Sequence, residues 1–211
     1  MNGIKIDRIV RSRRRTIALA ISPDATLTVR APFGVSLDFI RKLVSEKEAW
    51  IEKRKTRILK NGEPPKPKEF INGEEFYYLG VVQKLQFENR KGLGLQARRE
   101  KVIGWFKKQA LLRITERAEF FANQTGWKFS KISISQAESR WGSCSAKNAI
   151  RFSWKLIMAP LEVIDYVVVH ELAHIPEKNH SARFWAKVSS VIPDWKIRRK
   201  WLRDNGNKFR V

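Results

Sequence analysis

Several residue types are scarce in this sequence of 211 residues. It contains one cysteine, three histidines and two methionines. The single cysteine, Cys144, excludes an internal disulfide, and this favours a cytoplasmic protein. No apolar run approaches the roughly 20 residues of a membrane-spanning helix. No apolar segment follows the basic residues at the start, so we expect neither a membrane contact nor a secretory signal.

Acidic residues are also few in comparison with basic ones. The chain has 43 Lys and Arg but 21 Asp and Glu, which gives a net charge of +22. Such a field attracts polyanions, so non-specific contact with nucleic acid through the basic surface is one expectation. A solvated basic surface with no specific partner is the other, because no nucleic-acid-binding module is recognisable. The arginines at 11–15 carry the same two interpretations, a phosphate contact or an exposed strand edge protected by charge.

The pattern of apolar residues predicts an α+β protein in two parts. Alternating residues predict strands within 4–31, with a hairpin turn at Ser22–Asp24. One helix is expected over 36–60, capped by Ser36. Strands return over 70–98, so the first part is a strand-rich unit at 1–98. Helical spacing from Glu100, two strands and a helix from Leu161 to Ile175 predict a second unit at 99–211.

The three histidines lie within eleven residues, at His170, His174 and His180. Residues four apart on a helix share a face, so His170 and His174 can direct one nitrogen each toward a common metal ion. Glu171, between them, places a carboxylate beside the open coordination positions. The HExxH spacing therefore predicts a metal site in which Glu171 takes a proton from a water that the metal activates.

Pro176 determines whether His180 can join this site. In a continued helix, His180 would lie roughly 9 Å beyond His174. Proline ends the helix, and a turn can bring His180 back as a third ligand. Three imidazoles with an open position favour zinc, one ion per chain. The metzincin pattern is excluded, since Glu177 stands where it needs glycine and no methionine follows the motif.

Other residues near the motif are weaker candidates. Arg140 and Tyr166 are candidate contacts for the substrate or the transition state, although a buried ion pair for Arg140 and a core position for Tyr166 are the alternatives. Cys144 is expected to be a small buried residue at a strand end, and a fourth ligand or a nucleophile is the alternative. Asp165 and Glu177 are candidate hydrogen-bond acceptors for the ligand imidazoles.

Three segments longer than the HExxH motif resemble those of a known protein family. They are SRWGSCS at 139–145, APLEVIDYVVVHELAH at 159–174 and NHSARFW at 179–185. The chain resembles the YgjP-like metallopeptidase-domain family, which is related to the SprT and WLM groups. The resemblance covers nearly the whole chain. It implies a zincin-like catalytic half with a short sheet and an active-site helix, His170, His174 and His180 as ligands, and Glu171 as the base.

These features predict a zinc-dependent hydrolase, with peptides as the leading substrate and no oligomeric state indicated. Two alternatives stay open. The same metal and base could hydrolyse a nucleotide or another phosphoanhydride, and an anionic substrate suits the basic field. Alternatively, the chain is a nucleic-acid-associated protein whose metal is structural.

Overall fold

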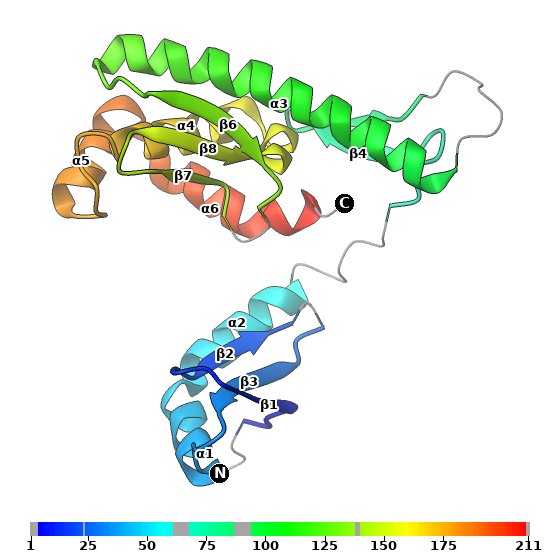
Figure 1. The fold of residues 1–211 in the computed structure, drawn as a ribbon, viewed down its shortest axis with the longest axis vertical. Coiled ribbons are helices and arrows are strands. Elements are labelled where there is room, and N and C mark those ends of the chain that lie inside the picture. Colours follow the sequence, from blue (N-terminus) through cyan, green and yellow to red (C-terminus); the bar gives the residue numbers. More distant parts are fainter. Residues whose placement is uncertain (1–3, 23, 61–67, 87–93, 138–139, 210–211) are drawn as a thin grey trace. The chain divides into compact units, whose positions relative to one another are not determined.

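The computed structural model describes residues 4–22, 24–60, 68–86, 94–137 and 140–209. The chain is a mixed α+β protein, as its sequence predicts. It forms two compact units, Met1–Pro65 and Lys66–Val211 (Figure 1). Within the described segments, no helix combines the length and the apolar composition that crossing a membrane requires.

The first unit places two helices against a three-stranded sheet. Its elements are β1 (Arg8–Ser12), β2 (Ala18–Ile21), β3 (Leu27–Pro32), α1 (Leu37–Glu46) and α2 (Glu48–Lys60). The strand order is β1-β3-β2, with β1 parallel and β2 antiparallel to β3. Leu27, Val29 and Ala31 alternate along β3 and are fully buried. The predicted hairpin is therefore confirmed as the β2–β3 pair.

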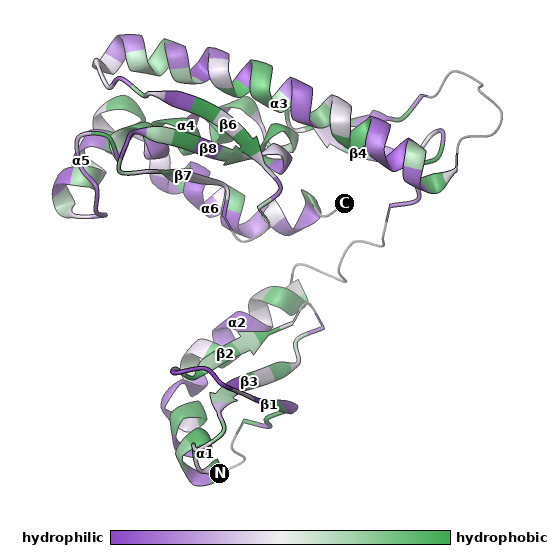
Figure 2. Cartoon of the chain, viewed as in Figure 1, coloured by the Kyte–Doolittle hydropathy of each residue, from purple (hydrophilic) through white to green (hydrophobic). Residues whose placement is uncertain are grey.

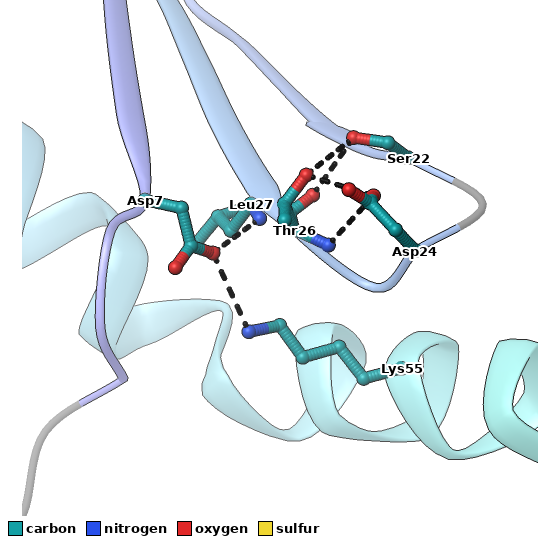
Figure 3. A network of polar contacts seen from close by, with 6 residues as sticks. All are labelled: Asp7, Ser22, Asp24, Thr26, Leu27 and Lys55. Carbon is teal, nitrogen blue, oxygen red and sulfur yellow. Dashed lines mark hydrogen bonds and ion pairs between the residues drawn. The ribbon is translucent and has the colours of Figure 1, made fainter.

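Polar contacts join the start of this sheet to α2 and close its hairpin turn (Figure 3). Asp7 Oδ2 accepts a hydrogen bond from the backbone N–H of Leu27 at 2.6 Å and lies 3.8 Å from Lys55 Nζ. In the turn, Thr26 Oγ1 donates to Asp24 Oδ1 at 2.9 Å. The carboxylate of Asp7, directly before β1, therefore links the start of β1 to β3 and α2.

The helix predicted over 36–60 is two helices. Ser36 does cap α1, since its Oγ accepts a hydrogen bond from the N–H of Phe39 at 3.2 Å. At Lys47 the backbone leaves the helical region, and α2 begins at Glu48. Nothing in the local contacts explains this break. The arginine run is partly structural, because Arg11 donates to the carbonyl oxygens of Pro32, at 2.9 Å, and Val35.

The second unit contains a second three-stranded sheet, a hairpin and four helices among its described residues. In chain order, these are β4 (Glu75–Tyr78), β5 (Val81–Lys84), α3 (Leu95–Thr125), β6 (Lys131–Ser135), β7 (Gly142–Cys144), β8 (Ala149–Ser153), the 3₁₀ helix η1 (Trp154–Met158), α4 (Leu161–Ala173), α5 (Ala182–Val191), α6 (Trp195–Asn205) and the 3₁₀ helix η2 (Gly206–Phe209). The sheet order is β6-β8-β7, with β6 parallel and β7 antiparallel to β8. The short strand β7 is therefore an edge of this sheet.

Helix α3 runs along the second unit (Figure 1). Polar and apolar residues mix along its length (Figure 2). Its buried residues recur every three or four positions and so form one face: Val102, Phe106, Ala110, Ile114, Ala118 and Phe121. Gly126 ends it in the left-handed conformation, with φ 75°, which glycine adopts readily after a helix. The helix begins at Leu95 and not at Glu100, so the prediction of strands over 70–98 is wrong for residues 95–98.

The boundary between the units lies at 65/66 and not at the predicted 98/99. The segment with β4 and β5 packs on the second unit, where Phe76 contacts Phe106 with ring centroids 5.9 Å apart. The backbone N–H groups of Leu79 and Gly80 donate to the carbonyls of Ile157 and Met158 at 2.9 and 3.1 Å. The hairpin thus supports η1, directly before α4.

Gly80 tests how tightly this hairpin is attached. It has φ +81°, and an added Cβ would lie 2.8 Å from Pro160 Cγ. We expect Gly80→Ala to lower the free energy of unfolding by about 3 kcal/mol, from backbone strain and from the clash. Gly73→Ala is the matched control, with φ +80° and open space around the added Cβ, and it should cost about 1 kcal/mol. Urea denaturation measures both, and equal losses would show that the contact with Pro160 is unimportant.

Candidate metal centre and active site

Helix α4 carries two of the three histidines and the glutamate. It begins after Pro160 and is apolar on nearly all sides, with ten of its thirteen residues buried. A helix of this kind belongs in the interior of a domain. His170 and Glu171 lie in its last turns, and His174 is its C-cap residue. Their backbone is therefore held by the core of the second unit.

The three histidines converge. One side-chain nitrogen from each of His170, His174 and His180 lies within 4.8 Å of the others. The Nε2 atoms of His170 and His180 are 3.0 Å apart. Two nitrogens that bind one zinc ion at the usual 2.0–2.1 Å would be about 3.3 Å apart in tetrahedral geometry. The cluster thus has nearly the spacing of a metal site.

The turn after α4 brings His180 into the cluster. The N–H of Glu177 donates to the carbonyl of Ala173 at 3.2 Å, and Ser181 Oγ caps α5 by accepting from Phe184 N–H at 3.3 Å. His174 Nδ1 lies 3.2 Å from the carbonyl oxygen of Glu177. A proton on Nδ1 can make this bond and leaves Nε2 free to bind a metal. Glu177 therefore meets the imidazole of His174 through its backbone carbonyl and not through its carboxylate.

The packing and burial of the histidines hold their rings in place and favour the neutral form that binds metals. His170 Nδ1 is buried and has no hydrogen-bond partner in the described part of the chain. Its ring is instead held by Phe184, at 4.9 Å between centroids, and by Trp185, at 5.6 Å. Burial lowers the pKa of His170 to about 3 and lowers the pKa of His174, and the neighbouring histidines add to both effects. Neutral imidazoles are the form that binds metals, so these residues fit a metal ion.

Glu171 lies beside this cluster and is 5% exposed. Burial raises its pKa to about 8, and the positive charge of Arg140 opposes that rise. The carboxylate lies directly against Gly142 of β7. A Cβ at Gly142 would be 2.5 Å from Glu171 Oε1 and 2.6 Å from its Cγ. Gly142 was not a predicted site residue, yet its missing side chain is what leaves room for the carboxylate.

We expect Gly142→Ala to displace the Glu171 carboxylate and not to unfold the protein. The clashing atoms belong to the side chain of Glu171, which can rotate away at little cost. Any metal-dependent activity should fall about 10- to 100-fold, the effect of misplacing a catalytic group by about 1 Å. Gly104→Ala, on α3 with open space around the added Cβ, should leave activity unchanged. Activity and thermal melting of both variants test this, and full activity in Gly142→Ala would contradict it.

A cavity of about 310 Å³ adjoins His170 and Glu171. It is lined by Trp141, Gly142, Tyr166, Val167, His170, Glu171, Arg199, Leu202 and Arg203. Tyr166 is 5% exposed, and burial raises its pKa to about 12, so its hydroxyl stays protonated. Arg140 is exposed and is not among these lining residues, although its charge reaches Glu171. Arg199 and Arg203, from α6, are basic residues that the sequence did not suggest.

Two further candidates, Asp165 and Cys144, are not part of the histidine cluster. Asp165 accepts two hydrogen bonds from Arg117 of α3, at 2.6 and 2.9 Å. It therefore joins α3 to α4 through Arg117, and these hydrogen bonds do not involve an imidazole of the histidine cluster. Cys144 is half-buried on β7, and burial raises the pKa of its thiol. It lies outside the group of described residues that can hold a metal.

Comparison with known proteins gives one family and one solved structure. Residues 15–205 match the family model described as YgjP-like, metallopeptidase domain. The crystal structure of the metallopeptidase zymogen of Pyrococcus abyssi abylysin is similar at 22% identity, over 42% of this chain and 90% of that chain, with a TM-score of 0.40. No curated protein matches the chain. The range of the family match includes the three histidines, Glu171 and the residues that line the cavity.

Proposed function

The chain belongs to the YgjP-like metallopeptidase family, and from this premise we propose that it is a zinc-dependent peptidase with one zinc ion per chain. The observation that carries the proposal is the convergence of three imidazole nitrogens beside a buried glutamate. His170, His174 and His180 would hold the ion in a zincin-like site. Three protein ligands leave one position open, which is typical of catalytic and not of structural zinc.

The chemistry divides between the ion and the protein. When bound, zinc supplies a Lewis acid that polarises the substrate carbonyl and lowers the pKa of water. Glu171 then acts as the general base. Its carboxylate accepts a proton from the attacking water and delivers it to the nitrogen of the leaving amine. The close contact with Gly142 fixes this carboxylate beside the cavity.

Two residues are proposed as contacts of the substrate or the transition state. Tyr166 lines the cavity and its ring lies 5.9 Å from that of His170. Its hydroxyl can donate a hydrogen bond to an oxygen on which negative charge develops. Arg140 is on the loop before β7, near enough for its charge to act on Glu171. It can attract an anionic group of the substrate to the same place.

A substrate screen tests the proposal against phosphoanhydride hydrolysis. The zinc-loaded protein is incubated with a library of internally quenched peptides and, separately, with nucleoside triphosphates. We expect peptide cleavage that a chelator abolishes and added zinc restores, with no release of phosphate. Phosphate release without peptide cleavage would overturn the assignment in favour of nucleotide hydrolysis. Binding of zinc without turnover of either substrate would favour a structural metal.

A further inference from the structure

The cavity beside the histidines has a polarity that the peptidase assignment does not explain. Its wall includes two guanidinium groups from α6, Arg199 and Arg203, which are four residues apart and so share one face of the helix. Glu171 is the acidic residue among the described residues that line the cavity. We assign Glu171 to proton transfer. The positive charge of Arg199 and Arg203 is then available to attract a negatively charged group of the substrate.

Arg199 is exposed and has an aromatic contact, which orients its guanidinium. Its guanidinium lies 5.1 Å from the ring centroid of Trp185, a distance typical of a cation–π contact. Trp185 stacks on Trp195, with centroids 4.2 Å apart and planes at 16°. The same Trp185 ring lies 5.6 Å from His170 and 5.7 Å from His180. One indole therefore contacts both Arg199 and two of the proposed metal ligands.

The two arginines are not equivalent. Arg203 Nε is 3.1 Å from Asp204 Oδ1, so a carboxylate of the protein already shares its charge. Lys200 Nζ also approaches Asp204, at 3.3 Å. In the described part of the chain, the guanidinium of Arg199 contacts an aromatic face, which leaves its edge to donate hydrogen bonds. Arg199 is thus the better placed of the two to meet a carboxylate.

The rest of the wall suits the stem of an acidic side chain. Trp141, Val167 and Leu202 give it an apolar part beside the arginines. Its volume, about 310 Å³, is at the lower end of the range for ligand pockets. A short methylene stem that ends in a carboxylate complements such a pocket. Planar guanidinium groups bind carboxylates in a two-point geometry that lysine cannot provide.

We propose that this cavity is the subsite for an acidic residue of the peptide substrate, next to the cleaved bond, and that Arg199 determines this preference. The inference rests on the proposed peptidase function and names the substrate class of the same site. A charge-assisted pair in a partly enclosed site contributes enough to favour glutamate over glutamine by about 10- to 100-fold in kcat/KM.

Matched peptides test the preference. The zinc-loaded protein is given peptides that differ only by Glu, Gln or Lys, placed in turn at each of the positions that flank the cleaved bond. In the wild type, Glu should exceed Gln about 10- to 100-fold at one position. Arg199→Gln should reduce this ratio to about 2 or less by slowing the Glu peptide alone. Lys200→Gln, the same loss of charge on the adjacent residue, should keep the wild-type ratio.

Binding to an inactive variant gives a second readout. Calorimetry on Glu171→Gln should show the same preference for the Glu peptide, and Arg199→Gln in that background should remove it. If the wild type cleaves Glu and Gln peptides equally, or if Arg199→Gln slows all peptides alike, the subsite assignment is wrong and the peptidase function stands. If no peptide is cleaved, the peptidase proposal fails, and equal binding of the two peptides then overturns the subsite as well.

Discussion

Replacing Glu171 with glutamine should lower kcat for peptide hydrolysis by about 1,000-fold or more and leave the metal bound. The amide has nearly the shape of the carboxylate but cannot accept the water proton, and a general base contributes about 10²- to 10⁴-fold. Glu171 is not one of the three converging histidines. Its burial raises its pKa to about 8, so a neutral amide is tolerated in this place. Peptide turnover and metal content, measured on the same preparation, check both parts.

The matched control for this variant is Glu162→Gln. Glu162 is exposed in the first turn of the same helix, nine residues before Glu171, and so about 13 Å away along the axis. It should retain wild-type turnover, because it is far from the histidines. If Glu171→Gln keeps more than about a tenth of wild-type kcat, the general-base assignment is wrong. Loss of the metal in Glu171→Gln would instead indicate that Glu171 helps to hold the ion.

Replacing His180 with alanine should weaken zinc binding by at least about 100-fold. Removing a partner that only supports a metal ligand costs about 10- to 100-fold, and loss of a ligand itself costs more. His180 is exposed, so its removal should leave the fold intact. Competition with a chromogenic chelator measures the affinity, and circular dichroism checks the fold.

Asn179→Ala is the control for the His180 variant. Asn179 precedes His180 in the turn and accepts a hydrogen bond from the N–H of Ser181 at 3.2 Å. Its change disturbs the same turn without removing an imidazole, so zinc affinity should stay within about threefold of wild type. Equal affinity in His180→Ala and wild type would show that His180 is not a ligand, despite its 3.0 Å approach to His170.

The histidine cluster could be predicted because its geometry is local. The i, i+4 spacing of His170 and His174 needs only a helix, and Pro176 makes a turn before His180 necessary. Gly142 and Arg199 could not be found in this way. They lie on β7 and α6, and they meet Glu171 and the histidines through packing across the second unit. A missing side chain that makes room for another residue leaves no periodic signal in a sequence.

In the fold, too, features set by neighbouring residues could be predicted, and features set by packing between distant residues could not. The β2–β3 hairpin and the Ser36 cap follow from neighbouring residues, and both are confirmed. The boundary at 98 was wrong because the apolar residues of 70–84 indicate strands but not which core they join. Phe76 joins the second core through Phe106, which is thirty residues later in the chain.

Metal content measured together with peptide hydrolysis is the most direct test of the zinc peptidase assignment. The purified protein is analysed by mass spectrometry for metals, then stripped with a chelator and reconstituted. About one zinc ion per chain is predicted, with peptide cleavage lost on stripping and recovered in proportion to the zinc restored. Peptide cleavage by zinc-free protein, or three intact histidines that fail to take up zinc, would contradict the account.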